Sequence, residues 1–529
     1  MNFVDFTVVA IYLVGLLIMG FVFRKQVSKK DYFLANRQLG WKPLSLSIMA
    51  TQLSAVSFIS APAFVGLREN GGLIWLSYEL ALPLAMLALL YFILPTLYRS
   101  GVVSVYDFLE QRFGRSSRVL ISVVFQISRS FATAIMIYAI SIILQSTMGL
   151  AFWQSVLLIG VITLIYSLQG GMKAVVYGDA VQMVLIVAGA LVCLGFGLYH
   201  IGGWTSFLEQ VQPERLSTLN TSSYGFDGEG FGLLPMIFGG IVLYASYYGC
   251  DQSEAQRSLS AKSLGDLKKI IMAASFLRFP ITLIYCFAGL IIGTLALTTP
   301  EFLAQIPEDQ PDWLMPIFIV NYLPNGILGL LLVAILAAAM SSLSSAINSL
   351  AAVSVEDYCR VVGKTLSPES TLQVAKYTGM FWGLLTLSLS FVVDDIAPTI
   401  IEAINKIGSV CFGPILATFF LGVCTKHLSA KQVNTGLIAG VLLNIYLWLA
   451  QPDVFWFWWN VIGFSTALGV SLGVYWLSHK KFKQPFINTR QDVLTKTNMA
   501  ALITWCVVLI GICIALPLSL IHISEPTRR

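Results

Sequence analysis

The sequence predicts an all-α membrane protein with about 14 transmembrane helices. Two observations lead to this fold class. Of the 529 residues, 57% are hydrophobic and 11% are charged, whereas a soluble protein carries about 25% charged residues. Runs of roughly 20 apolar residues recur along the whole chain, and a helix needs this length to cross the hydrocarbon core of a bilayer. The runs are too continuous for the alternating pattern of an outer-membrane barrel.

The apolar runs fix where each helix is expected. The first run lacks a basic start and a small-residue cleavage site, so we expect a retained helix rather than a signal peptide. Residues 1–517 are expected to form a single transmembrane domain, and residues 518–529 read like the translation of a sequencing-library adapter. The expected spans lie near residues 4–23, 44–66, 73–97, 118–148, 152–170, 175–199, 232–250, 270–298, 326–355, 372–393, 397–423, 432–450, 454–478 and 498–517.

Basic residues gather in every second loop. The stretches 24–42, 99–118, 257–269 and 480–496 are rich in lysine and arginine, whereas 299–325 holds four acidic residues and no basic one. By the positive-inside rule the basic loops face the cytoplasm, so both termini are expected outside. We expect a multi-pass protein embedded in the lipid bilayer of a bacterial inner (plasma) membrane. The net charge of +5 then reflects orientation, and neither a nucleic acid nor an obligate protein partner is expected.

Cysteine and histidine give no sign of an enzyme. The eight cysteines are scattered without a Cys-x-x-Cys pair, and we interpret them as free thiols. The four histidines lie at the ends of spans or in the 518–529 tail. No nucleophile with its base, and no metal cluster, converges within a span, so catalysis is not expected.

The ninth expected span carries four serines in five positions, namely Ser341, Ser342, Ser344 and Ser345. Hydroxyl groups supply hard oxygen ligands without a net charge, and this suits a weakly bound alkali cation. The alternative is a seam of small residues that lets helices pack closely.

The second expected span is dense in hydroxyl and amide side chains. This composition predicts a helix that unwinds in mid-membrane, where freed carbonyls line a cavity. The alternative is an unbroken helix that faces protein neighbours. The polar residues are Ser45, Ser47, Thr51, Gln52, Ser54, Ser57 and Ser60.

Five motifs, in order, resemble those of the sodium/solute symporters, the family of sodium–glucose, sialic acid, monocarboxylate and iodide carriers. The resemblance covers nearly all of the chain up to about residue 480. The motifs are 31–37 (Asp-Tyr-Phe-Leu-Ala-Asn-Arg), 100–114 (Ser-Gly-Val-Val-Ser-Val-Tyr-Asp-Phe-Leu-Glu-Gln-Arg-Phe-Gly), 169–179 (Gln-Gly-Gly-Met-Lys-Ala-Val-Val-Tyr-Gly-Asp), 250–262 (Cys-Asp-Gln-Ser-Glu-Ala-Gln-Arg-Ser-Leu-Ser-Ala-Lys) and 355–358 (Val-Glu-Asp-Tyr).

The resemblance implies a leucine-transporter-type core of five plus five inverted helices, within residues 44–423, with 4–23, 432–450, 454–478 and 498–517 as peripheral helices. It also implies Na⁺ as the coupling ion. The ligands of a first sodium ion would be Ala50, Leu53, Ala338, Ser341 and Ser342. A second sodium ion, as in some members, would use Asp179, Ser344 and Ser345 together with Ser341. The alternative for Asp179 is a solvated position at the end of its span.

The resemblance also implies a substrate site that includes ionisable residues within spans. Glu79 matches a sugar-binding glutamate, Arg129 an arginine that holds a carboxylate, and Lys406 a position where glucose carriers have glutamine. Tyr247 matches a tyrosine that caps the solute, and Gln52, Ser54 and Ser57 would face the same cavity. The alternative is that the charges pair internally, as Glu79 with Arg129 or Glu402 with Lys406, which would leave a neutral site.

These expectations favour a sodium-coupled symporter that imports a small polar solute by alternating access. The favoured solute is a sugar acid such as sialic acid, or another organic acid. A neutral sugar remains an alternative, and so does a monocarboxylate or an inorganic anion. An ion channel would need rings of charge or a repeated filter loop, and the sequence has neither.

Overall fold

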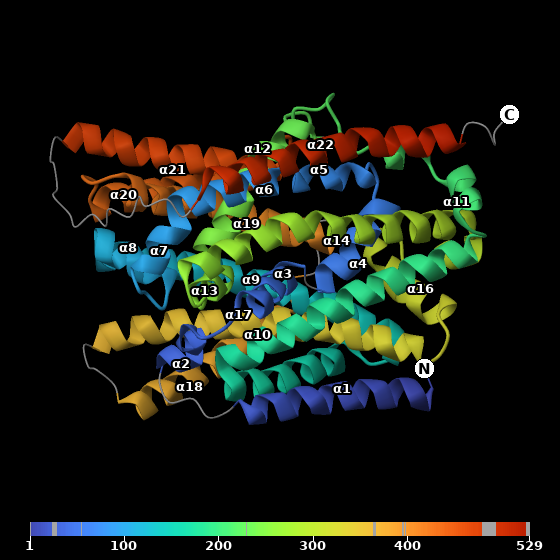
Figure 1. Cartoon of the computed structure of the whole chain (residues 1–529), viewed down its shortest axis with the longest axis horizontal. Coiled ribbons are helices and arrows are strands. Elements are labelled where there is room, and N and C mark those ends of the chain that lie inside the picture. The colour runs from blue at the N-terminus through green and yellow to red at the C-terminus, as the bar shows by residue number, and fades with distance from the viewer. Residues whose placement is uncertain are drawn as a thin grey trace.

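The structure, a computed structural model, describes residues 2–23, 29–53, 55–228, 230–362, 367–393, 396, 398–478 and 494–524. Long α-helices run side by side along the molecule (Figure 1). In hydrocarbon this arrangement satisfies the backbone, because each helix bonds its own N–H and C=O groups. The long helices are α1 (Phe3–Val22), α9 (Arg115–Met148), α10 (Phe152–His200), α12 (Leu233–Cys250), α14 (Leu264–Thr298), α17 (Ile327–Val362), α18 (Pro368–Leu389), α19 (Ile400–Cys424), α20 (Ala430–Ala450), α21 (Trp456–Ser478) and α22 (Lys496–Ser524).

Shorter helices complete the bundle. The second expected span is formed by α3 (Trp41–Gln52) and α4 (Ala55–Gly66). The third consists of η2 (Leu73–Trp75), α5 (Leu76–Glu79), α6 (Ala81–Ala88), η3 (Leu89–Ile93) and α7 (Leu94–Arg99). The connections carry α2 (Lys29–Leu34), η1 (Ala35–Arg37), α8 (Val105–Phe113), α11 (Trp204–Gln210), η4 (Pro213–Leu216), α13 (Gln252–Leu259), α15 (Pro300–Leu303), η5 (Pro311–Trp313) and α16 (Leu314–Tyr322).

Each predicted span falls on a helix, but the helices differ in length. Among the described residues, eleven helices are long and apolar enough to cross a membrane, and a bent pair raises this number to twelve. The remaining two predicted spans coincide with a shorter apolar helix, Phe152–Ile165, and with α18. The start of α1 and the end of α22 lie at the same end of the bundle (Figure 1).

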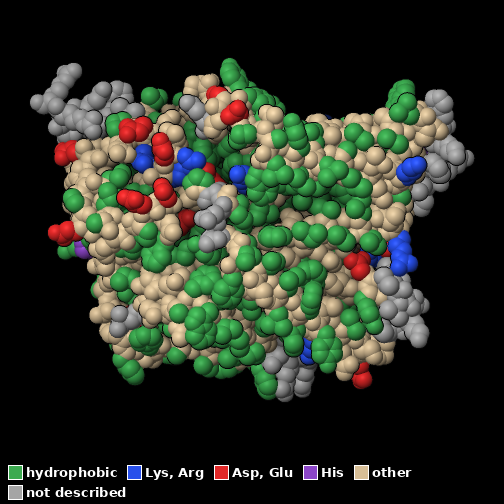
Figure 2. Space-filling model, turned by 180° about the vertical axis from the view of Figure 1, so that it is seen from behind, with side chains coloured by type: hydrophobic (Ala, Val, Ile, Leu, Met, Phe, Trp, Pro, Cys, Tyr) green, Lys and Arg blue, Asp and Glu red, His purple; other side chains and the backbone are tan. Residues whose placement is uncertain are grey.

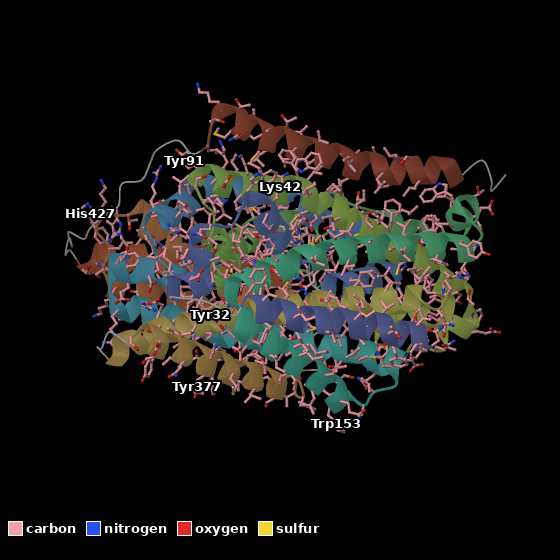
Figure 3. The ribbon with its side chains drawn as sticks, turned by 60° about the horizontal axis from the view of Figure 1, so that its bottom comes forward. Tyr32, Lys42, Tyr91, Trp153, Tyr377 and His427 are labelled. Atoms are coloured by element: carbon pink, nitrogen blue, oxygen red, sulfur yellow. The ribbon has the colours of Figure 1, made fainter. Side chains whose placement is uncertain are left out.

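The outer surface is suited to lipid. Hydrophobic side chains cover the middle of the face in Figure 2, and most charged side chains lie toward its two ends. Trp153 and Tyr377 are more than half exposed at the periphery, while His427 lies at the end of the bundle (Figure 3). Apolar groups outside and charges at the ends are the arrangement that a bilayer imposes.

The predicted break in the second span is confirmed. The axes of the two helices differ by 50° at a break between Gln52 and Val56. Leu53 leaves the helical conformation with φ −85° and ψ 62°, and its N–H still bonds the carbonyl of Met49. The later carbonyls of α3 have no intrahelical donor, because a helix leaves its last C=O groups free.

Glycines allow the broken helix to lie against α14. A Cβ atom on Gly293 would come within 2.3 Å of the Gly66 Cα atom, and one on Gly289 within 2.3 Å of the Pro62 Cα atom. Gly289 and Gly293 are four residues apart on one face of α14, which is the small-residue spacing of close membrane helix pairs. Another glycine, Gly171, has φ +56° and separates the two spans within α10.

The serine-rich helix α17 occupies the centre of the bundle. It packs against α10, α3, α9, α18 and α1, and its side chains from residue 342 to residue 353 are all buried. At the carboxyl end, α22 continues as a helix as far as Ser524, and residues 525–529 lie outside the described residues.

Candidate functional site

A cavity of about 90 Å³ lies beside the break between α3 and α4. Its wall is formed by residues of the broken helix, η2, α5, α9, α12, α14 and α19. Of the predicted substrate residues, Gln52, Ser57, Arg129 and Tyr247 line this cavity. Ser54 lies outside the described residues. The break therefore lies at a cavity, as the sequence predicted, and polar side chains from different helices surround that space.

Arg129 lines the cavity with part of its hydrogen-bonding capacity unused. Its side chain is only 3% exposed, and its Nη1 lies 3.9 Å from Oδ2 of Asp251. Its Nε and Nη2 atoms are buried and have no hydrogen-bond partner among the described residues. These two N–H groups form one edge of the planar guanidinium, which matches the two oxygens of a carboxylate.

Glu79 does not line the cavity but neutralises a residue that does. It is fully buried on α5, and its Oε2 accepts a hydrogen bond from Arg278 Nε over 3.0 Å. Thr282 donates to its other oxygen over 3.2 Å. Arg278 and Thr282 both line the cavity. The alternative of a Glu79–Arg129 pair is therefore wrong, and Arg278, which the sequence analysis did not single out, is the true partner.

Lys406 is also placed elsewhere than expected. Its Nζ lies 5.4 Å from the ring centroid of Trp448 on α20, and Lys406 is absent from the cavity wall. The helix period explains this placement, because the side chains of α19 that reach the cavity follow a single stripe that excludes position 406. The alternative Glu402–Lys406 pair is wrong too, since Arg68 Nη2 lies 3.1 Å from Glu402 Oε1. The cavity stripe of α19 consists of Ile401, Ile404, Asn405, Gly408 and Phe412.

The residues expected at the first sodium site belong to the end of α3 and to α17, two helices that pack against each other. Ala50 and Leu53 are buried in the last turn and at the end of α3. Ser342 on α17 is fully buried, and its hydroxyl has no hydrogen-bond partner among the described residues. A buried polar atom is ordinarily hydrogen-bonded, so the hydroxyl of Ser342 has unused bonding capacity. Ala338 and Ser341 belong to α17, but their side chains are outside the described set.

Asp179, an expected ligand of the second sodium ion, is buried rather than solvated. It is 1% exposed on α10, and Nη2 of Arg257 lies 2.8 Å from its Oδ2. The same nitrogen donates to the hydroxyl of Ser345, and Nε of Arg257 donates to Ser47 over 2.7 Å. Ser344 is buried one position earlier, and its carbonyl accepts from Ser167 over 3.4 Å. An arginine of α13 thus holds two of the expected sodium ligands.

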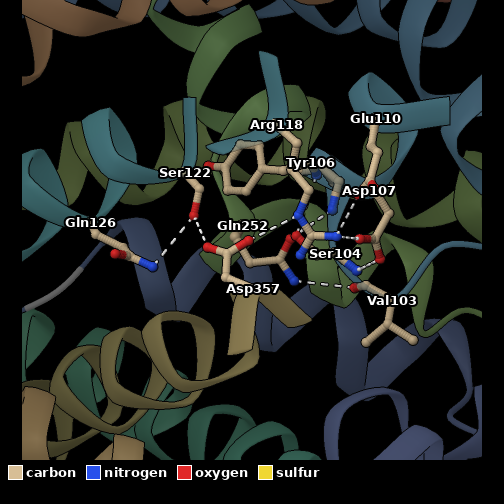
Figure 4. Close-up of polar contacts among 11 residues, drawn as sticks. Val103, Ser104, Tyr106, Asp107, Glu110, Arg118, Ser122, Gln126, Gln252 and Asp357 are labelled. Atoms are coloured by element: carbon tan, nitrogen blue, oxygen red, sulfur yellow. Dashed lines mark hydrogen bonds and ion pairs between the residues drawn. The ribbon is translucent and has the colours of Figure 1, made fainter. Parts of the chain in front are cut away.

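Short helices close this end of the bundle, which carries the basic loops. Gln256 on α13 donates to Asn348 of α17 over 2.9 Å, and Ser253 lies 3.0 Å from Ser349. Nearby, Arg118 joins three carboxylates from two helices, those of Asp107 and Glu110 on α8 and of Asp357 on α17 (Figure 4). Asp107 and Glu110 of the 100–114 motif thus stabilise the fold, because their shared partner Arg118 connects α8 to the end of α17.

A second polar cluster lies at the opposite end of the bundle, where η5 meets α19. Asp312 accepts a hydrogen bond from the Ile400 N–H over 3.0 Å, and Ser60 on α4 accepts one from Ile401 N–H over 2.9 Å. Burial raises the pKa of Asp312 to about 6, and the nearby Glu402 carboxylate acts in the same direction. This cluster connects α4 and α19, which both line the cavity.

The sequence of this chain matches a known protein family and several of its members. Residues 32–440 match the model of the sodium:solute symporter family. The chain is 29% identical over 466 residues to a putative sodium-dependent multivitamin transporter of Drosophila melanogaster, covering 85% of this chain and 75% of that one. It is 28% identical over 431 residues to the sodium-coupled monocarboxylate transporter 2 of Homo sapiens, covering 80% and 68%.

Among solved structures, a substrate-bound outward-open Na⁺-coupled sialic acid symporter matches with a TM-score of 0.80 and 23% identity. The match covers 92% of this chain and 100% of the other. This likeness confirms the predicted fold class, an all-α membrane protein with the leucine-transporter-type core of five plus five inverted helices.

Proposed function

Because this chain belongs to the sodium:solute symporter family, we propose that it imports a small organic acid together with sodium by alternating access. It is a multi-pass membrane protein, and sodium is its coupling ion. The family expected from the five sequence motifs is thus confirmed. The identity of the solute, the binding residues and the direction of transport are part of the proposal.

The unpaired edge of the Arg129 guanidinium is the observation that favours an organic acid as the solute. Its Nε and Nη2 are buried at the cavity without a protein partner among the described residues, and a buried donor that stays unpaired costs about 1–3 kcal/mol. A carboxylate satisfies both donors at once and neutralises the charge. The ion pair with Asp251, at 3.9 Å, leaves this edge free.

The size of the cavity favours a small acid over a nine-carbon sugar acid. A volume of about 90 Å³ is smaller than that of an apolar cavity of about 150 Å³ that holds one benzene molecule. A short monocarboxylate fits this volume, whereas sialic acid requires the cavity to widen. The human relative named above is a monocarboxylate transporter, which is in line with the smaller solute.

A neutral polar solute such as a sugar is the second candidate. It is favoured by the charge balance, because Arg278 has Glu79 at 3.0 Å and Arg129 has Asp251 within 4 Å. A sugar hydroxyl could accept only separate hydrogen bonds from the guanidinium edge of Arg129, whereas a carboxylate accepts two parallel ones. We therefore place the acid first.

Sodium and solute are coupled in this proposal through the broken helix. The first sodium ion would bind the carbonyls of Ala50 and Leu53 and the hydroxyl of Ser342, and so would join α3 to α17. Leu53 also lines the cavity, and Gln52 precedes it there. Sodium would thereby fix the wall against which the solute binds.

The orientation follows the basic loops. With these loops in the cytoplasm, the end with α8 and α13 faces inward and both termini face outward. Inward sodium movement gains about 2.3 kcal/mol per charge for each 100 mV of membrane potential. Two sodium ions with a monoanion carry net charge and respond to the potential, whereas one sodium ion with a monoanion does not.

Binding to the purified protein in nanodiscs tests the solute class. Lactate, sialic acid, glucose and proline are compared by calorimetry and thermal shift, in sodium and in potassium. We expect sodium-dependent binding of lactate that is lost in Arg129→Gln. The matched control is Arg115→Gln, an exposed arginine on the same helix, which should bind as the unaltered protein does. Glucose binding that survives Arg129→Gln would instead support the sugar.

A further inference from the structure

Arg257 is a deeply buried cation that lies outside the cavity wall. It is 2% exposed, although it belongs to a short connecting helix, α13. Its guanidinium reaches three separate helices, through Ser47 on α3, Asp179 on α10 and Ser345 on α17. Its Nη1 also donates to the carbonyl of Ser253 one turn earlier on α13.

The groups around this guanidinium are those that would bind an alkali cation. Asp179 supplies a buried carboxylate, and Ser47 and Ser345 supply hydroxyl oxygens. Hard oxygen ligands of this kind hold small cations, and a guanidinium meets the same oxygens through its N–H groups. Arg257 and a sodium ion cannot both take the Oδ2 of Asp179 and the hydroxyl of Ser345, because each would need the same space.

We propose that Arg257 is a tethered cation that occupies the Asp179–Ser345 site whenever sodium is absent from it. Sodium and the guanidinium are alternative occupants, and each displaces the other. This inference rests on the proposed function, since it requires a symporter that takes up a second sodium ion.

Charge balance gives the exchange its physical reason. A buried carboxylate without a positive partner is strongly unfavourable in a membrane protein. If sodium alone balanced Asp179, release of the ion would leave that charge bare when the empty carrier returns. With Arg257 available, Asp179 keeps a positive partner at every step of the cycle.

The exchange also links sodium to the closing of one end of the bundle. When Arg257 holds Asp179, α13 is fastened to α17 by two further contacts, Gln256 to Asn348 and Ser253 to Ser349. When sodium displaces Arg257, α13 loses its charged contact and only these neutral contacts remain. Occupation of the site by sodium therefore loosens α13, and departure of the ion fastens it again.

Sodium binding to Arg257→Gln, measured without solute, tests the competition. The readout is the sodium concentration that gives half of the sodium-induced thermal shift, with potassium keeping the ionic strength constant. We expect this concentration to fall about tenfold, because the tethered competitor is gone. Arg257→Lys retains a tethered cation, so its half-saturating sodium concentration should stay near that of the unaltered protein. The double variant Arg257→Gln with Asp179→Asn should not show the increased sodium affinity of Arg257→Gln.

An unchanged or weaker sodium affinity in Arg257→Gln would overturn the inference, because the arginine would then be structural only. If the unaltered protein shows no sodium-dependent shift, the proposed function itself fails, and the two failures are thus distinguished.

Hydrogen exchange of residues 252–259 in the unaltered protein gives a second test that needs no foldable Arg257 variant. We expect faster exchange in sodium than in potassium, and the same difference in Ser342→Ala at a saturating sodium concentration, because that substitution alters only the first site. Slower or equal exchange in sodium would overturn the inference.

Discussion

Arg278 on α14 and Glu79 on α5 form a buried ion pair in which Nε lies 3.0 Å from Oε2, and only the arginine also lines the cavity. The carboxylate therefore acts on the cavity through its partner. It fixes the guanidinium together with Thr282, and it cancels a charge that would otherwise stand uncompensated among apolar helices.

Glu79→Gln is expected to destabilise the protein, because it leaves Arg278 buried without its counter-charge. Breaking a buried pair from one side typically costs about 3–5 kcal/mol, and glutamine retains one oxygen acceptor, so the loss should lie at the lower end. The thermal midpoint in detergent measures this effect. The double variant Glu79→Gln with Arg278→Gln should recover part of the stability. A double variant that melts below the single one would contradict this account of the pair.

Ser342→Ala separates sodium binding from folding. The Ser342 hydroxyl makes no hydrogen bond among the described residues, so its removal should leave the midpoint in potassium unchanged. If it is a sodium ligand, the half-saturating sodium concentration should rise about tenfold, equivalent to about 1.4 kcal/mol. The control is Ser388→Ala on α18, where the hydroxyl is exposed and bonds its own helix. Equal sodium affinity in both variants would remove Ser342 from the site.

Gly293→Ala tests the close packing of α14 against the broken helix. A Cβ at this position would lie 2.3 Å from the Gly66 Cα, so α4 must move. Overpacking of this kind costs about 1–3 kcal/mol, and the shift should also weaken sodium-dependent binding. Gly473→Ala on α21 is the matched control, because nothing lies within 4 Å of its added Cβ. Equal thermal midpoints for Gly293→Ala and Gly473→Ala would show that the contact between α14 and α4 does not contribute to stability.

Acidification is expected to stabilise the cluster at Asp312. Its pKa is raised in the fold from 3.8 to about 6, so the folded protein binds more protons than the unfolded chain between these values. Stability should therefore rise as the pH falls from about 6 to about 4, by on the order of 3 kcal/mol in total. Asp312→Asn mimics the protonated form and should show a smaller pH dependence. The charged neighbours that remain are Glu402 and its partner Arg68. An identical profile in the variant would assign the dependence to another group.

The broken helix was predictable because its signal is local. Hydroxyl and amide side chains gather on the expected span 44–66, and the break falls within that stretch, at Leu53. The cavity positions of Arg129, Tyr247, Gln52 and Ser57 also agree with the sequence analysis. Their use in binding remains a prediction, as do the sodium ligands.

The pairing of charges was not predictable, because it depends on how distant helices cross. Glu79 meets Arg278, which is 199 residues away, and no spacing within the sequence indicates that contact. Lys406 lies outside the cavity wall for a different reason, since counting residues from a motif fixed its depth in the span but not its side of α19. Arg257 lay in a basic loop that orientation alone seemed to explain, yet its side chain is buried.

Sodium-driven uptake into proteoliposomes tests the central claim most directly. Vesicles with the purified protein receive labelled lactate under an inward sodium gradient, with potassium replacing sodium as the reference. The account predicts accumulation in sodium, none in potassium, and loss in Arg129→Gln but not in Arg115→Gln. Accumulation that ignores sodium, or that persists unchanged in Arg129→Gln, would contradict it.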